Sequence, residues 1–74
     1  MIKELDRVAL AEPVLENGLE AGDVGTVVMV HQGGKGYTVE FMTLTGATVA
    51  IVTLPADAVR PIRDREIAHA REVA

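Results

Sequence analysis

A glycine-punctuated turn runs directly into an apolar strand near the middle of the sequence, and this feature constrains the fold most strongly. The segment reads Leu-Glu-Ala-Gly-Asp-Val-Gly-Thr-Val-Val-Met-Val from Leu19 to Val30. Glycine adopts backbone conformations that other residues avoid, so Gly22 and Gly25 let the chain swing from a loop into a tightly coiled strand. A strand entered in this way is typical of small β-barrels, in which short strands coil strongly.

Length and composition limit the class of protein. The 74 residues suffice for one small domain with a single core. Cysteine is absent, which excludes disulfides and thiolate metal sites and fits a reducing cytoplasm. Met1–Arg7 carries charges where a signal peptide needs an apolar run, and no apolar stretch approaches the ~20 residues of a membrane span. We therefore expect a cytoplasmic protein that does not associate with membranes.

The net charge of −4 is concentrated in one segment, residues 12–23, which we call the acidic loop. The loop contains no basic residue, and its acidic residues are Glu12, Glu16, Glu20 and Asp23. Complementary charge speeds and orients protein association, so we predict that these four residues face a partner protein of basic character. The alternative is that the charges are merely solvated.

Alternating apolar residues and turn signals predict a mainly β protein. Glu12 to Asp23 is a long loop with apolar anchors, of which Leu19 is the preferred one, and a single 3₁₀ turn is expected within Pro55–Val59. Strands are predicted at Leu5–Ala11, Val24–His31, Tyr37–Met42, Thr48–Leu54 and Arg60–Ile62. A long loop after the first strand, two tight hairpins and a 3₁₀ turn before a short last strand indicate an SH3-like five-stranded barrel over residues 1–62.

Side-chain alternation predicts which residues fill the core. Because Glu40 must face water, the third strand should direct Tyr37, Val39 and Phe41 inward. The second strand is assigned its core residues as Thr26, Val28 and Val30. The fourth strand has apolar residues on both faces, so its register stays open.

These assignments leave apolar side chains pointing away from the core. A small barrel cannot bury both faces of its strands, and large exposed apolar patches mark interaction surfaces. We therefore predict an interface with a partner or with a second copy, formed by Val27, Met29, Val49 and Ile51. The alternative is that the C-terminal tail covers part of this surface.

The tail comprises residues 63–74 and is expected to pack on the barrel. One helix capped by Asp64 would place Ile67, Ala70 and either Val73 or Ala74 against it. An added strand is the alternative.

The chain resembles DUF4926, a bacterial family of small proteins. The similarity extends to about Ile62 and is carried by LDRVAL at Leu5–Leu10, GLEAGDVGTVV at Gly18–Val28, YTVEF at Tyr37–Phe41 and VTLPA at Val52–Ala56. These motifs consist of residues that form turns or fill the core, and the resemblance provides no catalytic residue. It implies a short stand-alone protein that pairs with the product of a neighbouring gene, in the manner of an antitoxin.

No constellation in the sequence predicts catalysis, a cofactor or a metal. His31 and His69 lack metal-ligand spacing, and serine is absent together with cysteine. The glycines of Gly33–Gly36 precede an alternating strand, which favours a hairpin over a phosphate loop. We predict a non-catalytic protein-interaction module, with antitoxin-like or regulatory pairing as its sharpest form. A nucleic-acid-associated module of the KOW type is the alternative, disfavoured by the negative charge and scarce aromatics.

Overall fold

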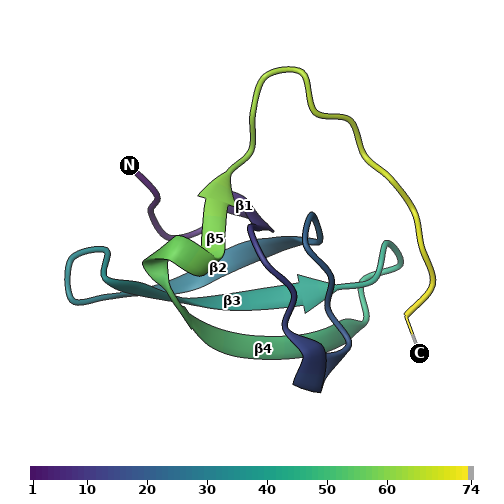
Figure 1. Ribbon diagram of the computed structural model, residues 1–74, viewed down its shortest axis with the longest axis horizontal. Helices are drawn as coiled ribbons and strands as arrows, with labels where there is room; N and C mark the ends of the chain where they lie inside the picture. Colours follow the sequence, from purple (N-terminus) through teal and green to yellow (C-terminus); the bar gives the residue numbers. More distant parts are fainter. Residues whose placement is uncertain (74) are drawn as a thin grey trace.

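The computed structural model describes residues 1–73 and confirms a mainly β protein with one five-stranded antiparallel sheet. The strand order is β4-β3-β2-β1-β5, as the ribbon in Figure 1 shows. Two 3₁₀ turns, η1 (Leu15–Asn17) and η2 (Ala56–Ala58), interrupt the loops. The strands are β1 (Arg7–Leu10), β2 (Val24–His31), β3 (Gly36–Met42), β4 (Thr48–Pro55) and β5 (Val59–Pro61).

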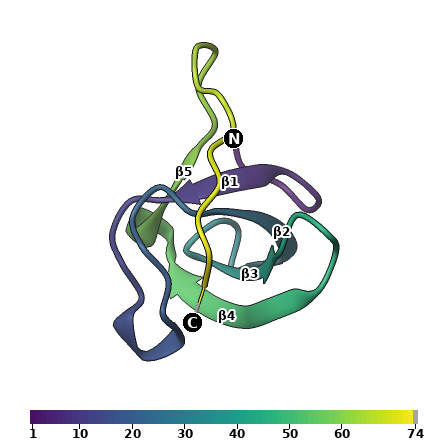
Figure 2. The same ribbon diagram turned by 90° about the vertical axis from the view of Figure 1, so that its right-hand side faces the viewer.

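The sheet curls strongly but does not close into the predicted barrel. Figure 2 shows the strands wrapping around the interior, with β4 and β5 at the two ends of the sheet. β5 pairs only with β1, and it is three residues long. Pro55 ends β4 and Pro61 ends β5, and proline has no N–H to donate to a ladder. The short η2 turn therefore joins two edge strands that stay unpaired with each other.

A bulge in β2 overturns the predicted alternation of that strand. Val27 pairs with Val39 and Met29 with Thr38, so Val28 is the extra residue. Val27 is 0% exposed in the core, whereas Met29 is 50% exposed on the outer face. The predictions that Val27 points outward and that Thr26 and Val28 fill the core are wrong, whereas Val30 does pack against the core. Counted back from Val30, the bulge shifts the inward and outward sets by one residue, so Thr26 lies opposite Glu40 on the outer face.

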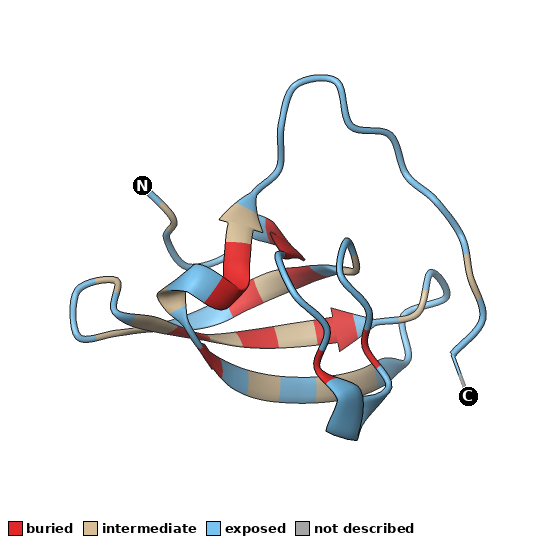
Figure 3. Cartoon of the chain, in the orientation of Figure 1, coloured by how far each residue is buried: buried red, intermediate tan, exposed pale blue. Residues whose placement is uncertain are grey.

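The core lies between the curled sheet and the acidic loop, as the buried segments in Figure 3 indicate. Tyr37, Val39 and Phe41 are buried as predicted. Pairing settles the open register of β4, because its inward side chains lie opposite these three residues. The pairs are Phe41 with Ala50, Val39 with Val52 and Tyr37 with Leu54. Leu19 is the predicted loop anchor, and Val14 is a second one.

The tail is not a helix within the described residues. It forms one turn, in which the Glu66 N–H donates to the Arg63 carbonyl at 3.2 Å, and then continues without regular structure. Ile67, predicted to contact the barrel, is 91% exposed. A helix of this length is marginal without tertiary packing, and the ion pairs described below hold both ends of the segment elsewhere. Ala74 lies outside the described residues. No helix within residues 1–73 is long and apolar enough to cross a membrane.

Gly25 is required for a different reason than the one the sequence suggests. Gly22 has a φ of 92°, as expected of a turn glycine, but Gly25 lies in regular strand backbone. A Cβ atom at Gly25 would lie 2.5 Å from Val39 Cγ1 and 2.9 Å from Phe41 Cε1. The missing side chain therefore lets the core face of β3 fold over β2.

Gly25→Ala should destabilise the protein by about 2 kcal/mol, because overpacking a tight core strains its neighbours. Shrinking the nearest neighbour relieves the clash, so Val39→Ala combined with Gly25→Ala should cost less than the sum of the two single changes. Urea unfolding of the four proteins measures this coupling. Additive effects would contradict the close approach.

Candidate functional site

The acidic loop binds an arginine side chain from the tail. Arg71 Nε donates to Asp23 Oδ1 at 2.9 Å, and Arg71 Nη2 donates to Asp23 Oδ2 at 2.5 Å. Nη2 also donates to the Gly18 carbonyl at 3.2 Å, and Glu20 Oε2 lies 3.6 Å from Nη1. Two N–H groups of the planar guanidinium thus donate to the two oxygens of one carboxylate, a geometry that lysine cannot reproduce.

The loop is stiff where it receives the arginine. Val14 and Leu19 exchange backbone hydrogen bonds at 3.0 and 3.1 Å, and both side chains are buried in the core. Gly18, between them, has a φ of 69°, which presents its carbonyl at the end of the η1 turn. These anchors hold the loop against the core next to the acidic groups.

Asp23 is itself oriented by the backbone. The Glu20 N–H donates to Asp23 Oδ2 at 2.8 Å, and the Asp23 N–H donates to the Glu20 carbonyl at 3.0 Å. The Arg71 hydrogen bonds, aided by the one from the Glu20 N–H, hold the pKa of Asp23 below its ordinary 3.8, against partial burial, which raises it. The carboxylate is therefore charged and aimed at the guanidinium at neutral pH.

A second ion pair fixes the base of the tail. Arg60 on β5 donates from Nη1 and Nη2 to the two carboxylate oxygens of Glu66, at 2.8 and 2.6 Å. The Arg63 N–H adds a bond of 2.8 Å to Glu66 Oε1. Figure 1 shows the tail arching away from β5 and returning to the acidic loop. Between these two attachments runs an open groove of about 1100 Å³, lined by residues of the loop and of the tail.

Of the four predicted acidic residues, the structure brings Glu20 and Asp23 together at Arg71. The side chains of Glu12 and Glu16 are exposed and make no ion pair or hydrogen bond within residues 1–73. The site is therefore the C-terminal half of the acidic loop.

The predicted apolar interface is only partly at the surface. Val27 is in the core and cannot belong to a surface, and Val49 is half-buried against the core at a β4 bulge. Met29 and Ile51 remain exposed on the outer face. Polar groups lie between them, including a chain of bonds from His31 Nε2 to Thr38 Oγ1 and from there to Thr53 Oγ1. The outer face is therefore not a continuous apolar patch.

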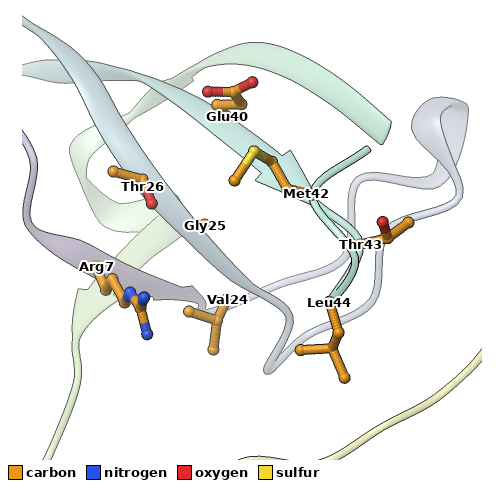
Figure 4. A pocket seen from close by; sticks show the side chains of 9 residues that line it. Arg7, Val24, Gly25, Thr26, Glu40, Met42, Thr43 and Leu44 are labelled. Carbon is orange, nitrogen blue, oxygen red and sulfur yellow. The ribbon is translucent and has the colours of Figure 1, made fainter. Parts of the chain in front are cut away.

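A smaller pocket of about 270 Å³ lies beside β1, β2 and β3. Figure 4 shows Arg7 and Glu40 at its opposite sides, with Met42 at the end of β3 and Leu44 on the turn that follows. The lining residues include no histidine and no nucleophile paired with a base. No group of three or more potential metal ligands occurs in the part of the chain that the structure describes.

Arg71 was missed as a site residue by the sequence analysis. It is 48 residues away from Asp23, and its local sequence has no motif that indicates a partner. Only the path of the tail brings the two together.

Fold and site define a class: a small, open, curled β-sheet whose first long loop holds an arginine side chain of the C-terminal tail. The model of the family described as Domain of unknown function (DUF4926) matches residues 4–61, so the chain belongs to this family. This match confirms the resemblance found in the sequence. Comparisons with curated proteins and with solved structures return no match.

The Arg60–Glu66 ion pair predicts how the attachment of the tail to β5 depends on pH. The hydrogen bonds of Arg60, together with the Arg63 N–H, lower the pKa of Glu66 from 4.5 to about 2. A carboxylate with a lowered folded-state pKa stabilises the fold above its unfolded pKa, and the effect is lost as pH falls. The tail base should therefore stay attached at pH 4.5 and be released near pH 2. Carbon-13 NMR of the Glu66 carboxyl measures this titration, and Arg60→Gln should return its pKa toward 4.5.

Proposed function

We propose that the protein is a non-catalytic interaction module whose acidic loop binds an arginine of a basic partner protein. In the free protein, Arg71 occupies the receptor in place of the partner. The observation that carries this proposal is the two-pronged contact between Arg71 and Asp23, supported by the Gly18 carbonyl and by Glu20. Antitoxin-like or regulatory pairing with a neighbouring gene product is the sharpest form of the proposal.

The extent of the family match supports a partner-supplied arginine. Gly18, Glu20 and Asp23 fall within the matched residues 4–61, whereas Arg71 falls outside them. The receptor is therefore part of the family domain, and its present occupant is not. The contact is also partly exposed, with a quarter of the Arg71 side chain accessible. Exposed ion pairs contribute ~0.2–1 kcal/mol, so a better-packed segment can displace the tail.

The nucleic-acid alternative has less support. The basic character of the C-terminal part rests on four arginines, and two of them, Arg60 and Arg71, are paired with carboxylates. Affinity for phosphates depends on basic groups that are free to replace counterions. The protein would have to break its own ion pairs to offer these arginines.

A peptide supplied in trans tests the receptor directly. In full-length protein with Arg71→Gln, a peptide with the sequence of residues 66–73 should bind with a dissociation constant no tighter than roughly 1 mM, because one partly exposed ion pair supplies most of the contact. The readout is the NMR shift change of the Gly18, Glu20 and Asp23 amides. Wild-type protein should bind the same peptide more weakly, since Arg71 competes.

Two matched controls accompany this titration. A peptide with lysine in place of its arginine should produce smaller shifts, because lysine cannot engage both carboxylate oxygens as a fork. Protein carrying Asp23→Asn in addition to Arg71→Gln should not respond to either peptide. Equal shift changes with the two peptides, or a shift change that persists in the Asp23→Asn protein, would contradict the proposed arginine receptor. With a partner captured from the native host, Asp23→Asn should likewise weaken association.

Nucleic-acid binding should be absent or non-specific. Titrations with single- and double-stranded DNA and RNA near 150 mM salt should give dissociation constants no tighter than about 10⁻⁶ M, the limit of ordinary non-specific affinity. Fluorescence anisotropy with labelled oligonucleotides measures this. Sequence-selective binding in the nanomolar range would favour the alternative function.

A further inference from the structure

The two edges of the sheet are protected to very different degrees. The β5 edge is three residues long and carries Arg60 and Pro61, both of which discourage pairing with another strand. The β4 edge runs for eight residues, Thr48–Pro55, with no charged side chain, with one bulge at Val49 near its start and with proline only at its end. A long, uncharged edge of this kind is a template for another strand.

The backbone of β4 shows which groups are free. The Ala56 N–H donates to the Lys35 carbonyl at 3.1 Å, and hydrogen-bonded pairs recur at every second residue of an antiparallel ladder. The peptide groups of Ala50, Val52 and Leu54 therefore point toward β3. Those of Ile51 and Thr53 point to the open edge, and no backbone hydrogen bond outside the β3 ladder involves either residue within residues 1–73.

We propose that a second copy of this chain pairs its β4 with this edge, antiparallel and symmetric about Ile51. Pairing Ile51 with its own counterpart uses the outward peptide groups of both copies. It also places Ala50 opposite Val52, and it brings Thr53 to the Val49 bulge of the other copy. Residues that lie opposite each other in this register point to the same face of the sheet. The core-facing surfaces of the two copies therefore lie on the same face of the joined sheet.

Self-pairing fits this edge better than pairing with the other edge. Ile51 lies near the middle of β4, after the bulge at Val49, and is 60% exposed, so the symmetric register places the largest exposed apolar side chain of β4 beside its counterpart. No charged side chain of β4 meets a like charge across the symmetry axis. The β5 edge is too short for pairing with the β4 edge of another copy, so chains of copies do not form and association stops at a dimer. The dimer does not depend on the arginine receptor, which lies in the acidic loop.

Sedimentation equilibrium of the full chain from roughly 10 µM to 1 mM tests the dimer, because small interfaces dissociate in this range. The wild type should reach twice the monomer mass at the upper end. Ile51→Lys should keep the monomer mass throughout, since a charge at an edge opposes strand pairing. Met29→Lys is the matched control: it adds the same charge to the outer face, but on β2, and should leave the dimer intact.

Amide hydrogen exchange provides a second readout that does not depend on a variant. The Ile51 and Thr53 amides of the wild type should exchange about threefold to fivefold more slowly at 1 mM than at 10 µM, because the fraction of monomers with an open edge falls by at most the square root of the hundredfold rise in concentration. A wild type that stays monomeric at 1 mM, or amides whose exchange ignores concentration, would overturn the proposal. So would equal loss of the dimer in Ile51→Lys and Met29→Lys, which would assign the contact to the face instead.

Discussion

The architecture depends on the close approach of β3 to β2 at Gly25. With no Cβ at this position, the inward side chains of Val39 and Phe41 fold over the strand that pairs beside them. That approach allows a sheet of five short strands to curl around a core made of a few aliphatic residues and two aromatic rings. A small core without disulfides gains most from dense packing, so a side chain at this point would disturb the whole domain.

The curled sheet leaves an opening that the acidic loop covers, and this gives the loop two roles. Val14 and Leu19 insert into the core, and the backbone between them is held by their mutual hydrogen bonds. The same anchoring stiffens Gly18, Glu20 and Asp23, which hold the guanidinium. If the loop binds a partner as we propose, a packed loop has the advantage that it loses little conformational entropy on binding.

The two proposed interaction surfaces are separate. The proposed arginine receptor lies at the acidic loop, and the proposed pairing edge is β4, at the opposite end of the sheet from β5. A dimer through β4 would present two receptors, and a partner carrying two basic segments would then bind with increased avidity. Polar side chains on the outer face, such as Thr38, Thr53 and Glu40, make that face a less favourable surface for association than the β4 edge.

Several features could be predicted from the sequence because they depend on local chemistry. Glycine and proline placed the turns, and alternation in β3 assigned Tyr37, Val39 and Phe41 to the core, because a single charged residue, Glu40, set the phase. In β2 no such residue sets the phase, and the bulge at Val28 reversed the assignment of Val27. Bulges depend on how two strands fit together, so they leave little trace in one strand's pattern.

The sequence alone determined the family, the strand content and the concentration of negative charge in one loop. Tertiary structure decided which acidic residues act together, since Asp23 and Glu20 meet Arg71 only because the tail returns to the loop. It also decided that the described part of the tail, residues 63–73, is not a helix and that the sheet stays open. Local propensities act between neighbours along the chain, whereas ion pairs, edges and bulges depend on residues far apart in sequence that only the folded chain brings together.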